Sequence, residues 1–174
     1  MDARKESEPA TMKNNTTMER TSERELVITR NVNGPARLVF EAWTNPEVFR
    51  QWWIPKSFGI TILSFDAEIR TGGQYRLVMA HGDSGPMAFF GRYLEVTPHS
   101  RLVWTNEESE DGGPVTTVTL EENGDQTLMV LHELYPSKEA LDAAMSSGEK
   151  SGMEETFEQL DELLASLGAV AGKG

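Results

Sequence analysis

The stretch VTTVTLEENGDQTLMVLHELY, residues 115–135, predicts two strands joined by a tight turn. Its first part is rich in the β-branched residues Val and Thr, and its second part is rich in Leu, Met and Val. The sequence Asn123-Gly124-Asp125 between them favours a hairpin, because glycine readily takes a positive φ. Pro136 ends the second strand, since proline cannot donate a ladder hydrogen bond. The hairpin indicates an antiparallel sheet.

The same period of two continues upstream of this hairpin. It predicts four further strands, at residues 58–69, 74–81, 87–97 and 101–107. Turn sequences separate them: RTGG (70–73), GDSG (82–85) and PHS (98–100). Gly91, inside the longest of these strands, is predicted to mark a β-bulge.

The N-terminal part predicts one more strand and two short helices. ELVITRNV (25–32) has the β-branched composition of a strand, and helices are expected at 36–44 and 46–53, the second with Asn45 as its N-cap. Residues 1–22 contain no Phe, Trp, Tyr, Leu, Ile or Val, and are therefore predicted to form a disordered tail. We expect a single domain over residues 23–168.

The C-terminal part predicts one long amphipathic helix over residues 138–167, followed by a frayed end at 169–174. Gly148 and Gly152 lie inside it, and each costs about 1 kcal/mol relative to Ala in a helix interior. They suggest a kink, a close backbone approach, or space left for something else. The predicted order is β-α-α-β6-α. This order predicts an α+β helix-grip fold, with a curved antiparallel sheet of about seven strands around the C-terminal helix.

Composition narrows the possible functions. The 174 residues include no Cys and carry a net charge of −12, which argues against disulfides, thiolate metal sites and a nucleic-acid partner. The apolar runs are too short for a membrane span and no secretory leader is visible, so we expect a soluble, cytoplasmic protein. Residues 106–162 hold 2 Lys and Arg against 16 Asp and Glu, which is either a solvated acidic face or a docking surface. The oligomeric state cannot be inferred.

The order of elements and several short motifs resemble the SRPBCC (START-like, birch-pollen-allergen-like) superfamily, and within it homologues of the activator of heat-shock protein 90 ATPase. The matching motifs are VFEAWTNPEVFRQWW (39–53), RTGGQYRLVM (70–79), GRYLEVTPHSRLVWT (91–105), GGPVTTVTLEE (112–122) and SSGEKSGMEETFEQLDELL (146–164). The resemblance implies a deep apolar cavity between the sheet and the long helix, where relatives bind lipids, hormones or polyketides. It also implies a chaperone as an alternative partner.

Aromatic and methionine side chains are the predicted lining of such a cavity, because they suit an apolar ligand with few polar anchors. The candidates are Trp52, Trp53, Phe58, Tyr75, Met79, Phe89, Trp104, His132, Met145, Met153 and Phe157. Phe40 and Trp43 are expected in the core, whereas Phe49, Trp52 and Trp53 are expected at the cavity mouth. A packed core needs the same residue types, so both interpretations remain open.

Catalytic and metal-binding motifs are absent from the sequence, and no catalytic residue, cofactor or metal is predicted. His132 is in register with Leu128, Val130 and Leu134, and is predicted to face inward as a hydrogen-bonded core residue, a ligand anchor or an acid–base group. The expected function is non-enzymatic binding of a small hydrophobic ligand, whether lipid, aromatic or polyketide-like, in the cavity between the sheet and the C-terminal helix. The alternatives are a chaperone-associated binding module, and a cyclase or hydrolase that uses His132 or Tyr75.

Overall fold

The computed structural model describes residues 16–83, 85–107, 113–146 and 152–173. Within these ranges an antiparallel sheet of eight strands has the order β1-β2-β8-β7-β6-β5-β4-β3. The strands are β1 (Thr16–Arg20), β2 (Glu25–Val32), β3 (Ile60–Ala67), β4 (Gln74–His81), β5 (Met87–Thr97), β6 (Arg101–Trp104), β7 (Val115–Asn123) and β8 (Gln126–Leu134). The helices are α1 (Ala36–Thr44), α2 (Pro46–Phe49), the 3-10 helix η2 (Lys56–Phe58), α3 (Lys138–Ser146) and α4 (Met153–Lys173). The predicted α+β helix-grip class is confirmed.

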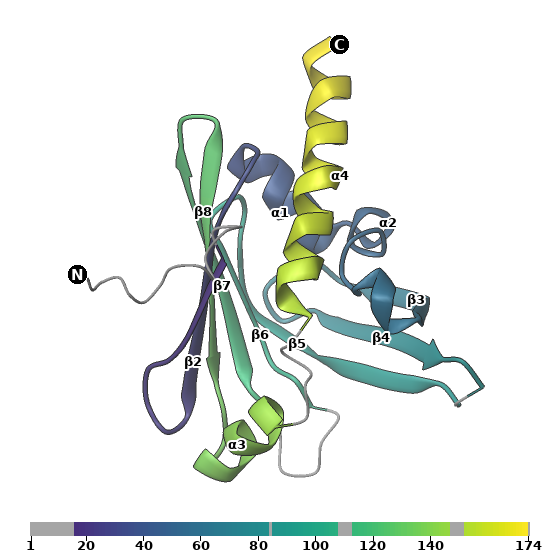
Figure 1. The fold of residues 1–174 in the computed structure, drawn as a ribbon, viewed down its shortest axis with the longest axis vertical. Helices are drawn as coiled ribbons and strands as arrows, with labels where there is room; N and C mark the ends of the chain where they lie inside the picture. The colour runs from purple at the N-terminus through teal and green to yellow at the C-terminus, as the bar shows by residue number, and fades with distance from the viewer. Residues whose placement is uncertain (1–15, 84, 108–112, 147–151, 174) are drawn as a thin grey trace.

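The sheet bends strongly, and α4 lies in the angle between its two halves (Figure 1). Strands β2, β8 and β7 form one half, and β4 and β5 run away from it beneath the start of α4. The helices α1 and α2 flank α4, whereas α3 lies at the opposite end of β7 and β8. This arrangement places the first turns of α4 over the concave face of the sheet.

The core is made by alternate residues of the strands and by one stripe of α4. Strand β2 contributes Leu26 and Ile28, and α4 contributes Phe157, Leu160 and Leu164, all buried. The 3–4 spacing of the α4 residues places them on one side of the helix. Full burial of each such side chain stabilises the fold by about 1.5–3 kcal/mol. The predicted apolar stripe is therefore the surface that packs on the sheet.

Strand β1 belongs to the segment that was expected to be disordered, and that expectation is wrong for residues 16–20. This polar strand pairs with β2, with Met18 opposite Ile28. The Arg30 side chain of β2, only 4% exposed, donates to the Thr16 hydroxyl. The backbone ladder and this buried contact supply what the apolar composition lacks. Residues 1–15 lie outside the described residues.

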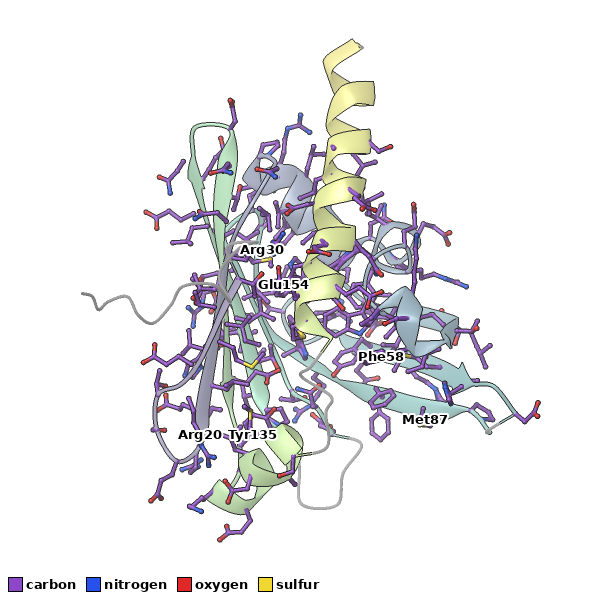
Figure 2. The ribbon with its side chains drawn as sticks, viewed as in Figure 1. Arg20, Arg30, Phe58, Met87, Tyr135 and Glu154 are labelled. Atoms are coloured by element: carbon purple, nitrogen blue, oxygen red, sulfur yellow. The ribbon has the colours of Figure 1, made fainter. Side chains whose placement is uncertain are left out.

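Arg30 also ties β2 to α4. Its Nη2 lies 2.6 Å from Oδ2 of Asp161, and its Nη1 lies 3.3 Å from Oε2 of Glu154. Figure 2 shows Arg30 and Glu154 between the sheet and the lower part of α4. Asp161 accepts a second hydrogen bond, at 3.0 Å, from the backbone amide of Asn33. One buried arginine thus connects the edge strand, its neighbour and the long helix.

The C-terminal helix is divided in two, so the prediction of one continuous helix over 138–167 is wrong. Helix α3 ends at Ser146 and α4 begins at Met153. Gly148 falls among residues 147–151, outside the described residues. Gly152 lies in the turn before α4. The α4 backbone stays helical to Lys173, beyond the point where fraying was expected.

Two local predictions are corrected by the structure. Helix α2 ends at Phe49, so Trp52 and Trp53 lie after it rather than within it, although Asn45 does cap it by accepting from the Glu47 amide at 3.0 Å. The β5 irregularity falls after Tyr93, not at Gly91. At Gly91 a Cβ atom would lie 2.2 Å from the Thr105 carbonyl oxygen, so glycine allows the two backbones to approach closely.

Candidate functional site

A cavity of about 360 Å³ lies between the concave face of the sheet, the segment after α1, and the start of α4. This volume is near the lower end of the range of about 300–1,000 Å³ for ligand pockets. Its lining comprises Trp43, Phe49, Trp53, Ile54, Pro55, Phe58, Ile60, Phe65, Tyr75, Leu77, Met79, Phe89, Tyr93, Trp104, Asn106, Pro114, Thr116, Leu131, Glu133, Tyr135, Gly152, Met153 and Thr156. Most of these side chains are apolar.

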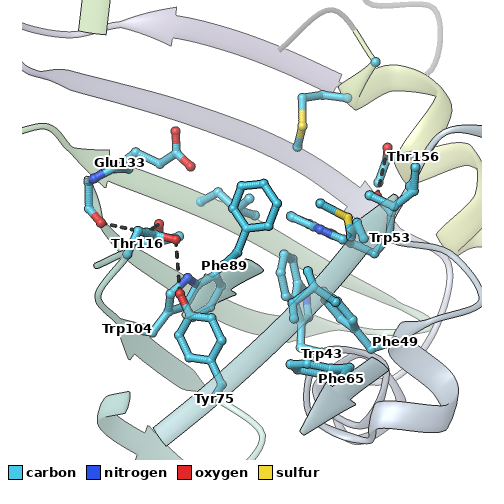
Figure 3. A pocket seen from close by; sticks show the side chains of 18 of the residues that line it. Trp43, Phe49, Trp53, Phe65, Tyr75, Phe89, Trp104, Thr116, Glu133 and Thr156 are labelled. Carbon is cyan, nitrogen blue, oxygen red and sulfur yellow. Dashed lines mark hydrogen bonds between the residues drawn. The ribbon is translucent and has the colours of Figure 1, made fainter. Parts of the chain in front are cut away.

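Aromatic rings dominate the wall, to which 10 of the 14 Phe, Trp and Tyr residues of the chain contribute. Trp43 is central, with ring centroids 5.5 Å from Trp53 and 5.6 Å from Trp104. Phe49 stacks on Trp53 at 5.1 Å and lies 4.7 Å from Phe65. Figure 3 shows these rings around the cavity, with Phe89 projecting into its middle. Such a wall offers flat apolar faces to a ligand.

The segment after α2 closes one side of the cavity and is fastened to α4. The Gln159 side-chain amide donates to the carbonyls of Trp52, at 3.0 Å, and Ile54, at 2.9 Å. The Gln159 carbonyl oxygen accepts from the Lys56 amide at 2.9 Å. Glu155 accepts from the backbone amide and the hydroxyl of Ser57, at 3.0 and 2.5 Å. We call residues 52–58 the mouth segment.

Hydrogen bonds from the Ser57 hydroxyl and backbone lower the pKa of Glu155 below its usual value. The ionised carboxylate is the form that accepts both bonds, so the mouth segment favours the charged state. The cavity wall contains a contrasting group in Tyr93, whose pKa is raised far above the ordinary tyrosine value by burial. Tyr93 therefore keeps its proton throughout the physiological range.

One end of the cavity is polar. Glu133 is buried, and one of its carboxylate oxygens accepts from the Tyr135 hydroxyl at 2.9 Å. Thr116 lies opposite Glu133 in the β7–β8 ladder. The Asn106 side-chain amide donates to Thr116 Oγ1 at 3.2 Å, and its oxygen accepts from Tyr75 at 3.2 Å. Figure 3 shows the Glu133 side chain extending toward the middle of the cavity, on the side away from Trp53 and Thr156.

Seven of the eleven sequence-predicted residues line this cavity: Trp53, Phe58, Tyr75, Met79, Phe89, Trp104 and Met153. Trp52 and Phe157 are fully buried behind the wall, with their rings 6.4 Å apart. The Trp52 indole donates to the Ala42 carbonyl at 2.9 Å, which fixes it as a core residue. Met145 is 40% exposed on α3, outside the cavity.

His132 does not face the cavity, so the prediction for this residue is wrong. It is half exposed, and its Nε2 lies 2.8 Å from Oε2 of Glu25. The inward positions of β8 are the odd-numbered ones, including Met129, Leu131 and Glu133. Glu133, the neighbour of His132 in the sequence, therefore faces inward and lines the cavity. An acid–base role for His132 on a ligand in this cavity loses its structural basis.

The cavity residues that the sequence prediction omits include Trp43, Asn106, Thr116, Glu133 and Tyr135. The hairpin turn contains the signal that identifies two of them, Thr116 and Glu133. With Asn123 paired to Gln126, the register places Thr116 opposite Glu133, and the apolar residues Val118 and Leu120 identify the inward face. Trp43 is assigned to the core rather than to the cavity wall because a cavity wall and a core have the same composition, whereas Phe49 lines the cavity as expected.

Two negative findings concern the described residues. Within them, no three His, Asp or Glu side chains converge in a way that could hold a metal ion. None of the helices in the described ranges is long and apolar enough to cross a membrane.

Comparison with protein-family models matches residues 33–165 to the model described as "Activator of Hsp90 ATPase homolog 1-like protein". This range is more than half of the chain. The chain belongs to the Activator of Hsp90 ATPase homolog 1-like family. The resemblance to the SRPBCC superfamily drawn from the sequence motifs is thereby confirmed. A search of the curated proteins finds no match.

Solved structures share the fold of this family member. A protein of Rhodobacter sphaeroides is 23% identical, with a TM-score of 0.79 over 87% of this chain and 99% of its own. A protein of Nitrosomonas europaea is 25% identical, with a TM-score of 0.77 over 85% and 98%. A protein of Mycobacterium smegmatis is 22% identical, with a TM-score of 0.73 over 87% and 99%. These similarities concern the fold and name no ligand.

Proposed function

We propose that the domain binds a small hydrophobic ligand, in particular an aromatic one, in the cavity between the sheet and α4 without transforming it. The observation that carries the proposal is the cavity of about 360 Å³ whose wall is largely aromatic. Offset and edge-to-face ring contacts favour a flat ligand over a flexible one. A fully packed core would leave few voids larger than a water molecule.

The cavity volume also limits the ligand. At about 360 Å³ the space suits a compact molecule of one or two fused rings. A long acyl chain would need a larger or more extended space. A compact aromatic molecule therefore fits this cavity better than the lipids that relatives of the superfamily bind.

Phe89 and Phe90 provide a matched pair for testing the proposal. They are neighbours in β5, but Phe89 lines the cavity whereas Phe90 is 42% exposed on the other face. Thermal unfolding with an uncharged naphthalene alcohol should show a rise in Tm for the wild type. The rise in Tm should be much smaller in Phe89→Ala and retained in Phe90→Ala. A contact between the Phe89 ring and the ring of the ligand contributes about 0.5–1.5 kcal/mol beyond the area that it buries.

A library of small apolar compounds extends the same test, with native mass spectrometry as the second readout. Binding of at least one compound at a stoichiometry of one, lost in Phe89→Ala, is expected. If neither method detects any compound, or if Phe90→Ala weakens binding as much as Phe89→Ala does, the cavity is not the binding site.

A chaperone-docking role is the second candidate, and family membership is the observation that favours it. The acidic residues of α3 and α4, such as Glu139 and Glu155, would then meet a basic surface of the partner. Salt-sensitive binding to a chaperone and a change in its ATPase rate would support this role. Absence of both would remove it.

A further inference from the structure

The charge of the cavity wall carries a conclusion about the ligand. Among the described residues that line the cavity, Glu133 is the one carboxylic acid, and none is Lys, Arg or His. The polar groups at this end of the cavity include the hydroxyls of Tyr135 and Thr116 and the amide group of Asn106. The wall of this end is therefore negatively charged or neutral over the described residues.

The aromatic part of the wall also favours a cationic ligand. Trp43, Trp53 and Trp104 all line the cavity, so three of the four Trp residues of the chain surround one space. The face of an indole ring carries partial negative charge and attracts cations, more strongly than the faces of Phe and Tyr do. A carboxylate and several indole faces around a small cavity form a combination that recognises organic cations.

We propose that the ligand of this cavity is a small aromatic amine, bound with its ammonium group at the Glu133 end and its ring among the tryptophans. This inference rests on the proposed function, because it names the ligand class for the same cavity. The ammonium donates to the Glu133 carboxylate, and the Tyr135 hydroxyl holds that carboxylate in place at 2.9 Å. The ring occupies the space between Trp53 and Phe89, whose ring Figure 3 shows in the middle of the cavity.

The arrangement disfavours a carboxylate ligand such as a fatty acid or an aromatic acid. Its negative charge would be desolvated next to the Glu133 carboxylate, without a cationic side chain among the described lining residues to pair with it. A neutral aromatic alcohol would keep the ring contacts and could still donate a hydrogen bond to the carboxylate, but it would lack the charge–charge attraction of an ammonium group. The expected order of affinity is therefore amine, then alcohol, then acid.

Three probes of equal ring size test this order by isothermal titration calorimetry at neutral pH: naphthylethylamine, naphthylethanol and naphthylacetate. The wild type should bind the amine about tenfold more tightly than the alcohol, since the ammonium adds a charge–charge attraction to the hydrogen bond that either probe can donate to the carboxylate. Glu133→Gln should reduce this preference to within about twofold, because the glutamine oxygen accepts from either probe and carries no charge. Glu25→Gln is the control, because Glu25 pairs with His132 on the outer face of the sheet.

The outcomes separate the two proposals. Alcohol binding without a preference for the amine, equal binding of the acid, or an unchanged preference in Glu133→Gln would overturn the inference and leave the proposed function intact. Failure of all three probes to bind would overturn both. The wild-type selectivity decides the matter even if Glu133→Gln does not fold, and circular dichroism of each variant establishes whether it does.

Discussion

Gly152 lies directly against Phe58: a Cβ atom at position 152 would be 2.7 Å from Cζ of the Phe58 ring. It would also lie 2.6 Å from Cγ of Pro55. Both distances are below 3.0 Å, so any residue other than glycine at this position would have to displace the Pro55 or Phe58 side chain. The glycine that seemed unfavourable in a predicted helix thus allows α4 to begin beside the cavity.

Gly152→Ala should therefore displace Phe58 and Pro55 and deform the cavity mouth. We expect the free energy of unfolding to fall by about 1–3 kcal/mol, as for other overpacked sites. Affinity for a naphthalene ligand should fall as well. Gly85→Ala is the control, because no atom lies within 4 Å of its Cβ position. Equal stability of the two variants in urea denaturation would show that the contact is not restrictive.

Gln159 should hold the mouth segment against α4. Its side chain makes hydrogen bonds to Trp52, Ile54 and Lys56, so Gln159→Ala should cost about 1–3 kcal/mol of unfolding free energy. Hydrogen exchange measures the local effect, because the Lys56 amide loses its acceptor. Glu162→Ala, exposed on the same helix, is the control. Unchanged exchange at Lys56 would mean that the segment is held by its apolar contacts alone.

The Glu155–Ser57 contact predicts a pH dependence. The pKa of Glu155 is lowered from 4.5 by the Ser57 hydrogen bonds, so its contribution to stability is fully present above about pH 4.5. That contribution is lost as the pH falls through the lower pKa of the folded state. The difference in Tm between the wild type and Glu155→Gln should therefore shrink as the pH falls from about 6 to about 3. A difference that stays constant across this range would contradict the prediction.

Arg30 should secure β1 and α4 to the sheet. Arg30→Met keeps the length of the side chain but leaves Asp161, 17% exposed, with only the Asn33 amide in place of its cationic partner. We expect the free energy of unfolding to fall by about 2–3 kcal/mol. This is at the low end for a broken buried pair, because the side chains of Glu154 and Asp161 are partly exposed to solvent. Arg37→Met, exposed on α1, should change the stability little. A loss in Arg30→Met no larger than in this control would show that the ion pairs do not stabilise the fold.

Turns and periodicity made most of the fold predictable. The strands at 25–32, 74–81 and 87–97 agree with the structure at both ends, because proline, glycine or polar turns bound them. Strand β1 could not be predicted from its composition, since Thr16–Arg20 is held by the β2 ladder and by Arg30, a contact distant in sequence. The division of the helix into α3 and α4 could not be predicted either, because Gly152 packs against Pro55 and Phe58, contacts that sequence periodicity does not contain.

The types of residue that line the cavity could be predicted from the sequence, but which side chains of a strand face it could not. Strand β8 has apolar residues on both faces, so alternation alone could not show whether His132 or Glu133 faces inward. In addition, Glu133 places a charged residue among the inward positions of β8, where an apolar one is expected. Trp52 lies in the core whereas its neighbour Trp53 lines the cavity. The backbone turns after α2 decide which of the two faces the cavity, and the sequence does not specify these turns.

The central claim is that a small aromatic ligand occupies the cavity between the sheet and α4. The most direct test is a two-dimensional NMR titration of the labelled protein with an uncharged naphthalene alcohol. The indole signals of Trp53 and Trp104, which line the cavity, should shift, whereas that of Trp52, bonded to Ala42 behind the wall, should move far less. Shifts confined to the outer face of the sheet, or no saturable shifts at all, would contradict the account.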